Sequence, residues 1–472
     1  MSRVWCLVVL CFAVVLSVVC VSAFAQAPVA IADHEVALLP EPGASPPAAS
    51  TTEQTPAAQD ESPSNREFRI ALLWDPTPPI GSAADLIEIA HAYGWSWDNA
   101  RKAQYLRQAA DAAPGSKDST RALIKLGRVR AQTGDTAGAE AAFSEAVARR
   151  ADAETQAFVT VMQQFCQMLN AKDYASAKDL LLKTAEQWGG TELGAWAAQQ
   201  VGDLHRDYIV DFDAAIPYYQ AAIKAYPGTL VAQEAEVGIA ECLGWSYKHP
   251  MEAIAAFESA LVDVTSPRLR VRAVVCLGDA LNQAKEWTDA FDVLSDFIVQ
   301  CPDHPAVPLA RAWRSLAAAR LGYWDVAVQD AQAFVDSPTG RSGHPWIHAT
   351  ETFLGQDAFK RGDIADAEEH FGKALAGAPD PDAKALSWAG VGHCQAARGD
   401  PRAATTSFLT AADTVRISTL RCQYLYQAAL AAGSGGDRST QSQIINQMVV
   451  EFPGSHLTTR LVGHELLPPV EP

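Results

Sequence analysis

The chain has 472 residues, of which 49% are hydrophobic and 19% are charged, so most of it can build a core, either as several domains or as one long repetitive array. Its formal net charge of −18 disfavours nucleic acid or an anionic lipid surface as the main partner, because both would be repelled.

Residues 1–25 have the order of a secretory signal peptide. Arg3 precedes the apolar run "VWCLVVLCFAVVLSVVCV", and the triplet Ala23-Phe24-Ala25 predicts cleavage before Gln26. Two alternatives are an uncleaved anchor helix and a lipoprotein signal ending at Cys20, although valines precede that cysteine where small residues are expected. The prediction is a periplasmic or secreted protein, or one anchored in the membrane by this helix.

The next segment, residues 26–65, is rich in Pro, Ala, Ser and Thr, and from Pro40 onward it has no aromatic residue until Phe68. Such a composition buries too little apolar surface to order itself, so it predicts a disordered linker. A lead-in over 66–82, a repeat array over 83–465 and a short tail over 466–472 complete the chain. No later run is long and apolar enough to predict a membrane span.

One pattern recurs throughout the array. "TGDTAGAEAAFSEAV" from Thr133, "RGDIADAEEHFGKAL" from Arg361 and "RGDPRAATTSFLTAA" from Arg398 share a Gly-Asp pair and a later phenylalanine. The equivalent large residue, called the anchor below, recurs every 37 to 40 residues and fixes a repeat architecture. The ten anchors are Tyr105, Phe143, Leu181, Tyr219, Phe257, Leu294, Ala331, Phe371, Phe408 and Ile445.

Small residues flank the anchors at helical spacing. An alanine lies four residues before eight of them, one helical turn away and therefore on the same face. Glycines sixteen residues before an anchor predict close crossing of an earlier helix, and prolines eight residues after it predict the end of the second helix. The glycines are Gly127, Gly278, Gly355 and Gly392, and the prolines are Pro227, Pro302, Pro379 and Pro453.

This pattern of Gly, Ala, aromatic, Ala and Pro resembles the tetratricopeptide repeat. The resemblance covers roughly residues 83–465 in ten units and is strongest from Arg121 to Leu409. Arg101 and Gln441 replace the small alanine in the first and last units, as expected of capping repeats. The family implies an all-α solenoid of helical hairpins that winds as a right-handed superhelix, with the first helices lining the concave side.

The junctions between units add a second resemblance. "APGSKDSTRA", "YPGTLVAQEA" and "FPGSHLTTRL" share a Pro-Gly-Ser/Thr step. This step is similar to that of bacterial envelope repeat proteins such as the TolA-binding protein and the outer-membrane assembly lipoprotein. The resemblance implies a compartment more than an activity. Within the repeat, Arg361-Gly362-Asp363 is predicted to be the turn between two helices and not an adhesion signal.

No catalytic constellation is present in the sequence, and the prediction is a protein that is not an enzyme and needs no cofactor. His344, His348 and Glu351 have a spacing that would suit a metal on a helix, but a helix start beside Pro345 is the favoured interpretation. His393 and Cys394 are adjacent, so on a helix their side chains diverge and cannot form a nucleophilic pair.

Six cysteines follow the signal, at 166, 242, 276, 301, 394 and 422. They are scattered, so buried free thiols are the favoured interpretation, with a bridge from Cys394 to Cys422 as the alternative.

The family resemblance implies which side chains face the groove. One position in each first helix is predicted to do so, and unit three holds one extra residue there. That row is Arg128, Cys166, Asp203, Glu241, Asp279, Leu316, Gln356 and His393. The basic cluster Arg121, Lys125, Arg128 and Arg130 could meet an acidic peptide or be a solvated helix face. Trp196 and Trp313 are either core residues or groove residues.

The functional prediction is an exported scaffold that binds a peptide or protein partner along its concave face, in assembly or maintenance of the cell envelope. Two alternatives come from other classes. One is an accessory subunit or enzyme with an unrecognised site, and the other is a structural envelope component that self-associates through its end repeats.

Overall fold

The computed structural model describes residues 82–95, 98–246, 248–341, 344, 346–378 and 380–465. Every regular element in these residues is a helix, which confirms the all-α prediction. They form two compact units, one ending at His344 and one following it. The predicted signal, linker and tail, and all of the lead-in except Ser82, lie outside the described residues.

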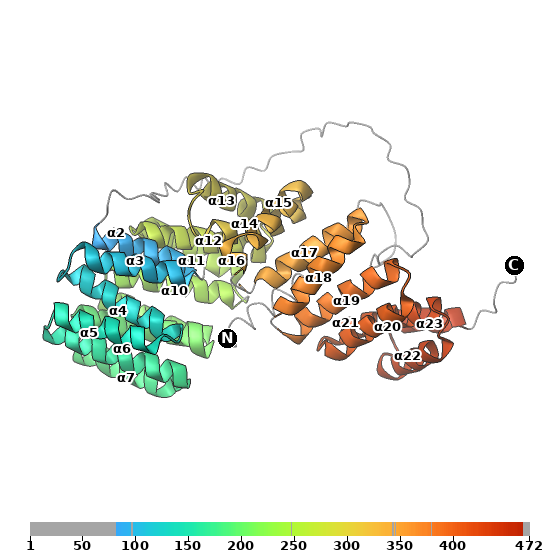
Figure 1. Cartoon of the computed structure of the whole chain (residues 1–472), viewed down its shortest axis with the longest axis horizontal. Coiled ribbons are helices and arrows are strands. Elements are labelled where there is room, and N and C mark those ends of the chain that lie inside the picture. The colour runs from blue at the N-terminus through green and yellow to red at the C-terminus, as the bar shows by residue number, and fades with distance from the viewer. Residues whose placement is uncertain are drawn as a thin grey trace. The chain divides into compact units, whose positions relative to one another are not determined.

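Unit 1 consists of seven consecutive helix pairs and a short additional helix (Figure 1). Its first helices are α2 (Ala83–Trp95), α4 (Lys117–Gln132), α6 (Ala153–Ala171), α8 (Glu192–Leu204), α10 (Leu230–Trp245), α12 (Pro267–Ala284) and α14 (Val307–Leu321). Its second helices are α3 (Asn99–Ala112), α5 (Thr136–Arg149), α7 (Tyr174–Gln187), α9 (Phe212–Ala225), α11 (Pro250–Asp263), α13 (Trp287–Gln300) and α15 (Trp324–Val335).

Unit 2 has three such pairs. They are α17 (Trp346–Arg361) with α18 (Ile364–Gly377), α19 (Pro381–Ala397) with α20 (Pro401–Thr414), and α21 (Ser418–Ser434) with α22 (Arg438–Glu451). A last helix, α23 (His456–Glu465), packs on α21 and α22. The chain passes from unit 1 to unit 2 in the longest interval between anchors, which also contains the extra helix α16 (Pro338–Arg341).

The turn inside each pair explains the recurring Gly-Asp. Gly362 ends α17 with a φ of 83°, in the left-handed region that glycine enters without strain. Asp363 then caps α18, and its carboxylate accepts a hydrogen bond from the Asp366 backbone N–H at 3.2 Å. The predicted role of Arg361-Gly362-Asp363 as a turn is confirmed.

Nine of the ten anchors are buried as predicted, and Tyr105 is half-buried. Phe143 and Phe371 are buried, and so are the alanines one turn before them. A Cβ added to Gly127 would lie 2.4 Å from the Phe143 ring, so glycine is required for the first helix to approach the anchor. The predicted proline positions also follow the ends of α9, α13 and α22, whereas Pro379 lies outside the described residues.

The extra residue predicted for unit three of the repeat lies in the fourth helix pair, α8 with α9, where a π-helical turn accommodates it. α8 continues directly into this turn, η1 (His205–Ile209), and Val210 then takes a left-handed φ of 65°. An inserted residue widens one turn of a helix without breaking it, and such turns are frequent at functional sites. Arg206 lies in this turn, and its side chain is buried.

The first helices of unit 1 form a closed circuit of contacts. α2 packs on α4, α4 on α6, α8 on α10 and α10 on α12, and α12 also touches α2. Phe158 of α6 packs against Trp196 of α8, with ring centroids 5.0 Å apart. Arg268 closes the circuit because its guanidinium lies 3.1 Å from the Glu88 carboxylate of α2. The sides of these six helices that face one another are called the inner face below.

The register of the repeat is open to a direct test in unit 2. Ala367 is fully buried, so Ala367→Trp is expected to destabilise the unit by about 1–3 kcal/mol or more through overpacking. Asp363→Ala removes only a helix cap and is expected to cost about 1 kcal/mol. Urea titration of both variants compares the two effects, and equal losses would contradict the predicted register.

All six described cysteines are free and buried, so Cys394 and Cys422 are not paired in the structure. Among the described helices, none has the length and apolarity needed to cross a membrane.

Candidate functional site

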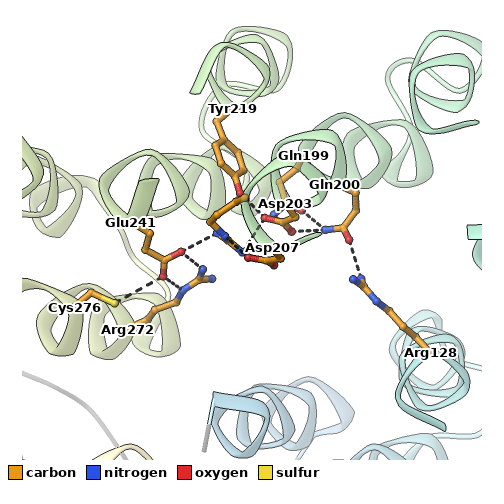
Figure 2. Close-up of polar contacts among 10 residues, drawn as sticks. Arg128, Gln199, Gln200, Asp203, Asp207, Tyr219, Glu241, Arg272 and Cys276 are labelled. Atoms are coloured by element: carbon orange, nitrogen blue, oxygen red, sulfur yellow. Dashed lines mark hydrogen bonds and ion pairs between the residues drawn. The ribbon is translucent and has the colours of Figure 1, made fainter. Parts of the chain in front are cut away.

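An ion network occupies the inner face beside the π-helical turn (Figure 2). Arg206 donates to Glu241 of α10 at 2.7 Å, and Arg272 of α12 donates to both oxygens of the same carboxylate. Glu241 is fully buried, which is tolerated for a carboxylate only when its charge is paired and hydrogen-bonded. The network therefore ties three consecutive first helices together.

Polar side chains extend this network toward α4. Asp203 of α8 accepts hydrogen bonds from the Tyr219 hydroxyl at 2.6 Å and from the Gln200 amide. The Gln200 carbonyl oxygen in turn accepts from Arg128 of α4 at 2.8 Å, as Figure 2 shows. Arg128 also lies over the Phe165 ring, 5.7 Å from its centroid. Two of the predicted groove residues, Asp203 and Glu241, are thus engaged within the protein.

Burial and charge shift the ionisation of this network. Burial lowers the pKa of Arg206, but Asp207 and its other anionic neighbours raise that pKa well above its usual value. Burial, and next the Glu241 carboxylate 3.9 Å from this sulfur, raise the pKa of the Cys276 thiol well above its usual value. A thiol kept protonated is a poor nucleophile. The arrangement is suited to holding helices together and not to attack by sulfur.

Asp279, another predicted groove residue, is buried on α12. Burial raises the pKa of its carboxyl to about 7, and its Oδ2 accepts a hydrogen bond from Gln283 at 3.0 Å. Its Oδ1 has no hydrogen-bond partner among the described residues. This carboxyl is therefore shared between its neutral and charged forms near neutral pH.

A second group of charged side chains, at the inner face and on the adjoining helix α3, consists of cations. Lys102 comes from α3, while Lys125 and Arg128 come from α4, and all three are half-buried. No ion pair is formed by any of them within the described part of the chain. Burial together with Arg128, Lys125 and Arg268 lowers the pKa of Lys102 to about 8. Burial also lowers the pKa of Lys125.

This shift predicts how stability depends on pH. Between about pH 8 and 10.5, Lys102 is largely neutral in the folded protein but still charged in the unfolded chain. The unfolded state then binds more protons, so the free energy of unfolding rises with pH through this window. We expect Lys102→Gln to lose that rise.

Urea titrations of the wild type and of Lys102→Gln across this window measure the effect. Lys183→Gln is the matched control, because Lys183 is an exposed lysine on the second helix α7. Parallel curves for the wild type and Lys102→Gln would contradict the assignment.

The structure divides the predicted basic cluster in two. Arg121 pairs with Asp118 at 2.7 Å and also with Glu192 of α8, and Arg130 lies 3.7 Å from Asp135. Lys125 and Arg128 have no such carboxylate partner in the described residues. Only the second pair is therefore free to meet an external anion.

The two predicted tryptophans are packing residues in unit 1. Trp196 is half-buried, and its ring packs on Phe158 and on Phe165, the latter with centroids 6.0 Å apart. Trp313 is 5% exposed and belongs to the core. Of the remaining row, Cys166 is buried and Leu316 is half-buried.

Unit 2 holds the last two predicted groove residues. Gln356 of α17 is half-buried, and His393 of α19 packs edge-on against Phe359 and Phe408. Burial lowers the pKa of His393 to about 4, so it is a neutral ring near pH 7.

The residues of the considered metal site have other partners. His348 Nδ1 lies 3.0 Å from the Ala374 carbonyl oxygen, and Glu351 lies 2.6 Å from His370. His344 packs edge-on against Phe334 in unit 1. A search of the described residues found no group of three His, Cys, Asp or Glu side chains placed to hold a metal ion.

We compared the chain with known protein families, curated proteins and solved structures. No protein-family model and no curated protein matches the chain. Among solved structures, a tetratricopeptide repeat protein from Parabacteroides merdae is 14% identical, with a TM-score of 0.40, over 58% of this chain and 99% of that one. The fold is of the tetratricopeptide-repeat type. The ten helix pairs and their buried anchors carry that assignment.

Two further structures show similar likeness. PilW, described as a widely conserved type IV pilus biogenesis factor, is 14% identical with a TM-score of 0.34, over 58% of this chain and all of that one. MamA is 23% identical with a TM-score of 0.29, over 38% of this chain and 94% of that one. Sequence identities this low indicate likeness of fold alone and say nothing about activity.

Proposed function

We propose that the protein is an exported, non-enzymatic scaffold that binds an extended peptide or a protein partner along the concave side that the first helices line. Its place would be in assembly or maintenance of the cell envelope. The binding proposal rests on one observation. From α2 to α12, each first helix packs on the following first helix, although a second helix lies between them in the sequence. This packing presents side chains from many helices to one extended ligand, so that modest contacts accumulate along it.

The chemistry of the buried thiols agrees with a role that is not catalytic. Burial raises the pKa of Cys166, Cys276 and Cys394, so these thiols stay protonated at neutral pH. The carboxylates Asp203 and Glu241 are engaged by arginine and tyrosine within the protein.

The export part of the proposal is supported by sequence alone. Arg3, the apolar run and Ala23-Phe24-Ala25 stand in the order of a cleaved signal. N-terminal sequencing of the protein from cells that make it naturally is expected to find Gln26 first. A chain that begins at Met1, or at Cys20 with lipid attached, would contradict it.

Site-specific photo-crosslinking in the same cells tests the binding part. A crosslinking amino acid at Leu316 or Gln356 reports on the predicted groove row, and one at Val299 or Glu369 reports on exposed second-helix positions. We expect the groove positions to capture a discrete partner that the outer positions do not. Mass spectrometry identifies the partner, and a second copy of the chain is one of the species it distinguishes.

Capture from the outer positions alone would place the binding surface on the second helices and overturn the proposal. Capture of the chain's own copies through the end repeats would instead favour a self-associating structural component. The double variant Arg128→Glu with Gln356→Ala is expected to abolish capture of the partner. Its helical signal and melting temperature should stay close to those of the wild type, because both sites are partly exposed.

A further inference from the structure

The charges on one side of the inner face do not balance. Five cations from α3, α4 and α12 interact there, and four carboxylates accompany them. The cations are Lys102, Lys125, Arg128, Arg268 and Arg272, and the carboxylates are Glu88, Asp203, Glu234 and Glu241. His91 of α2 adjoins them, and burial beside these cations lowers its pKa well below the usual value, so it adds no positive charge at neutral pH.

All four carboxylates already have partners within the protein. Asp203 accepts a hydrogen bond from Tyr219 and lies 3.2 Å from Arg206. Arg268 lies 3.1 Å from Glu88 and 2.5 Å from Glu234, so both carboxylates serve one guanidinium. Glu241 pairs with Arg272 and with Arg206 of the neighbouring network. Lys102, Lys125 and Arg128 are therefore the cations whose charge no described side chain neutralises by direct contact.

The fold brings these three side chains together and holds them there. Lys125 and Arg128 lie three residues apart on α4 and therefore share one face of that helix, and α3, which carries Lys102, packs directly on α4. Burial, and then the charges of Arg128, Lys125 and Arg268, lower the pKa of Lys102, and burial together with Arg268 and Arg128 lowers that of Lys125 against the opposing effect of Glu234 and Glu88. Like charges gathered in a partly desolvated site cost stability, which is the pattern expected of a binding site rather than of a structural contact.

We propose that Lys102, Lys125 and Arg128 form a binding site for a carboxylate-rich segment of the protein partner. This inference rests on the proposed function, since it names the chemistry of the ligand that the inner face would take. Carboxylates on the partner would supply charge-assisted hydrogen bonds to the two ammonium groups and to the guanidinium. Bringing in negative charge would also relieve the repulsion among the three cations.

A peptide fits this face better than a nucleic acid does. Glu88, Glu234 and Glu241 border the cations, and they would repel a continuous phosphate backbone. The whole chain carries a formal charge of −18, which adds a long-range repulsion against a polyanion. A peptide with a few acidic residues can place its charges on the three cations and leave neutral residues beside the carboxylates.

Fluorescence anisotropy of a labelled hexaglutamate peptide tests the proposal on the full chain. We expect saturable binding that weakens with added salt and that falls at least tenfold in Lys102→Gln with Lys125→Gln. The control is Lys183→Gln on the outer helix α7, which should bind the peptide like the wild type. The melting temperature of the double variant should equal or exceed that of the wild type, because it loses unpaired cations.

Four results would overturn the proposal. One is equal binding of hexaglutamate by the wild type and the double variant. Another is a clear loss of melting temperature in the double variant, which would show that the lysines have a structural partner. The third is tighter, lysine-dependent binding of single-stranded oligonucleotide than of hexaglutamate, which would make the site one for nucleic acid. Inorganic phosphate that competes with the peptide at equal concentration would likewise indicate a phosphate site.

Failure of this inference is distinguishable from failure of the proposed function. If hexaglutamate does not bind but groove positions still capture a partner in cells, only the acidic chemistry is wrong. If no groove position captures a partner, the proposed function itself falls, whatever the peptide does.

Discussion

Replacing Glu241 with alanine is expected to destabilise unit 1 by about 3–5 kcal/mol, the cost of leaving buried charges without their partner. Glu241 is fully buried and is shared by Arg206 and Arg272. Arg206 would keep Asp203 and Asp207, but Arg272 would lose its only carboxylate contact among the described residues. The loss should therefore be centred on α12.

Urea titration measures the total loss, and hydrogen exchange followed by mass spectrometry locates it. The matched control is Glu252→Ala on α11, since Glu252 is an exposed carboxylate 3.0 Å from His249. A surface pair of this kind contributes no more than about 1 kcal/mol. A loss below about 1 kcal/mol for Glu241→Ala would show that the network contributes little to folding.

Replacing Phe371 with alanine is expected to cost unit 2 about 3–5 kcal/mol, since the change empties a space that two glycines border. A Cβ added to Gly355 would lie 3.1 Å from this ring, and one added to Gly390 would lie 2.4 Å from it. The ring therefore fills the contact between α18 and the first helices on either side of it. Glu369→Ala, on the exposed side of α18, should leave the urea midpoint nearly unchanged.

A double variant sharpens this test. Gly390→Ala alone should destabilise unit 2, because its methyl group would meet the Phe371 ring. Adding Phe371→Leu, which leaves more room there, should recover part of the loss. If the double variant loses as much stability as the two single variants together, the two residues do not share one space, and the predicted packing is wrong.

Much of this fold could be predicted from the sequence because each unit repeats the same local solution. Phe143 and Gly127 meet across a helix pair, and their spacing is readable without knowing any other unit. The extra residue in unit three was also visible as a shift of Asp203 against its neighbours. What the sequence did not show is that a π-helical turn would absorb it and bury Arg206.

The inner face was less predictable because it depends on how the units curve. Glu241 was expected to face the groove, but arginines from α8–η1 and α12 enclose it. Lys102 was missed because it lies on a second helix, and the family places groove residues on first helices. Arg268 was missed because its partner Glu88 is 180 residues away. Contacts across a turn of the superhelix leave no short-range signal in the sequence.

The contact between α12 and α2 gives unit 1 a mechanical property that an ordinary solenoid lacks. In a simple stack each helix pair touches only the neighbouring pairs, so the array can extend elastically. Arg268 and Glu88 instead join the sixth helix pair to the first. Tension along the array would therefore act on the Arg268–Glu88 contact before it could separate the helix pairs that lie between α2 and α12. Unit 1 should accordingly be stiff up to the force at which this contact breaks and easier to extend above that force.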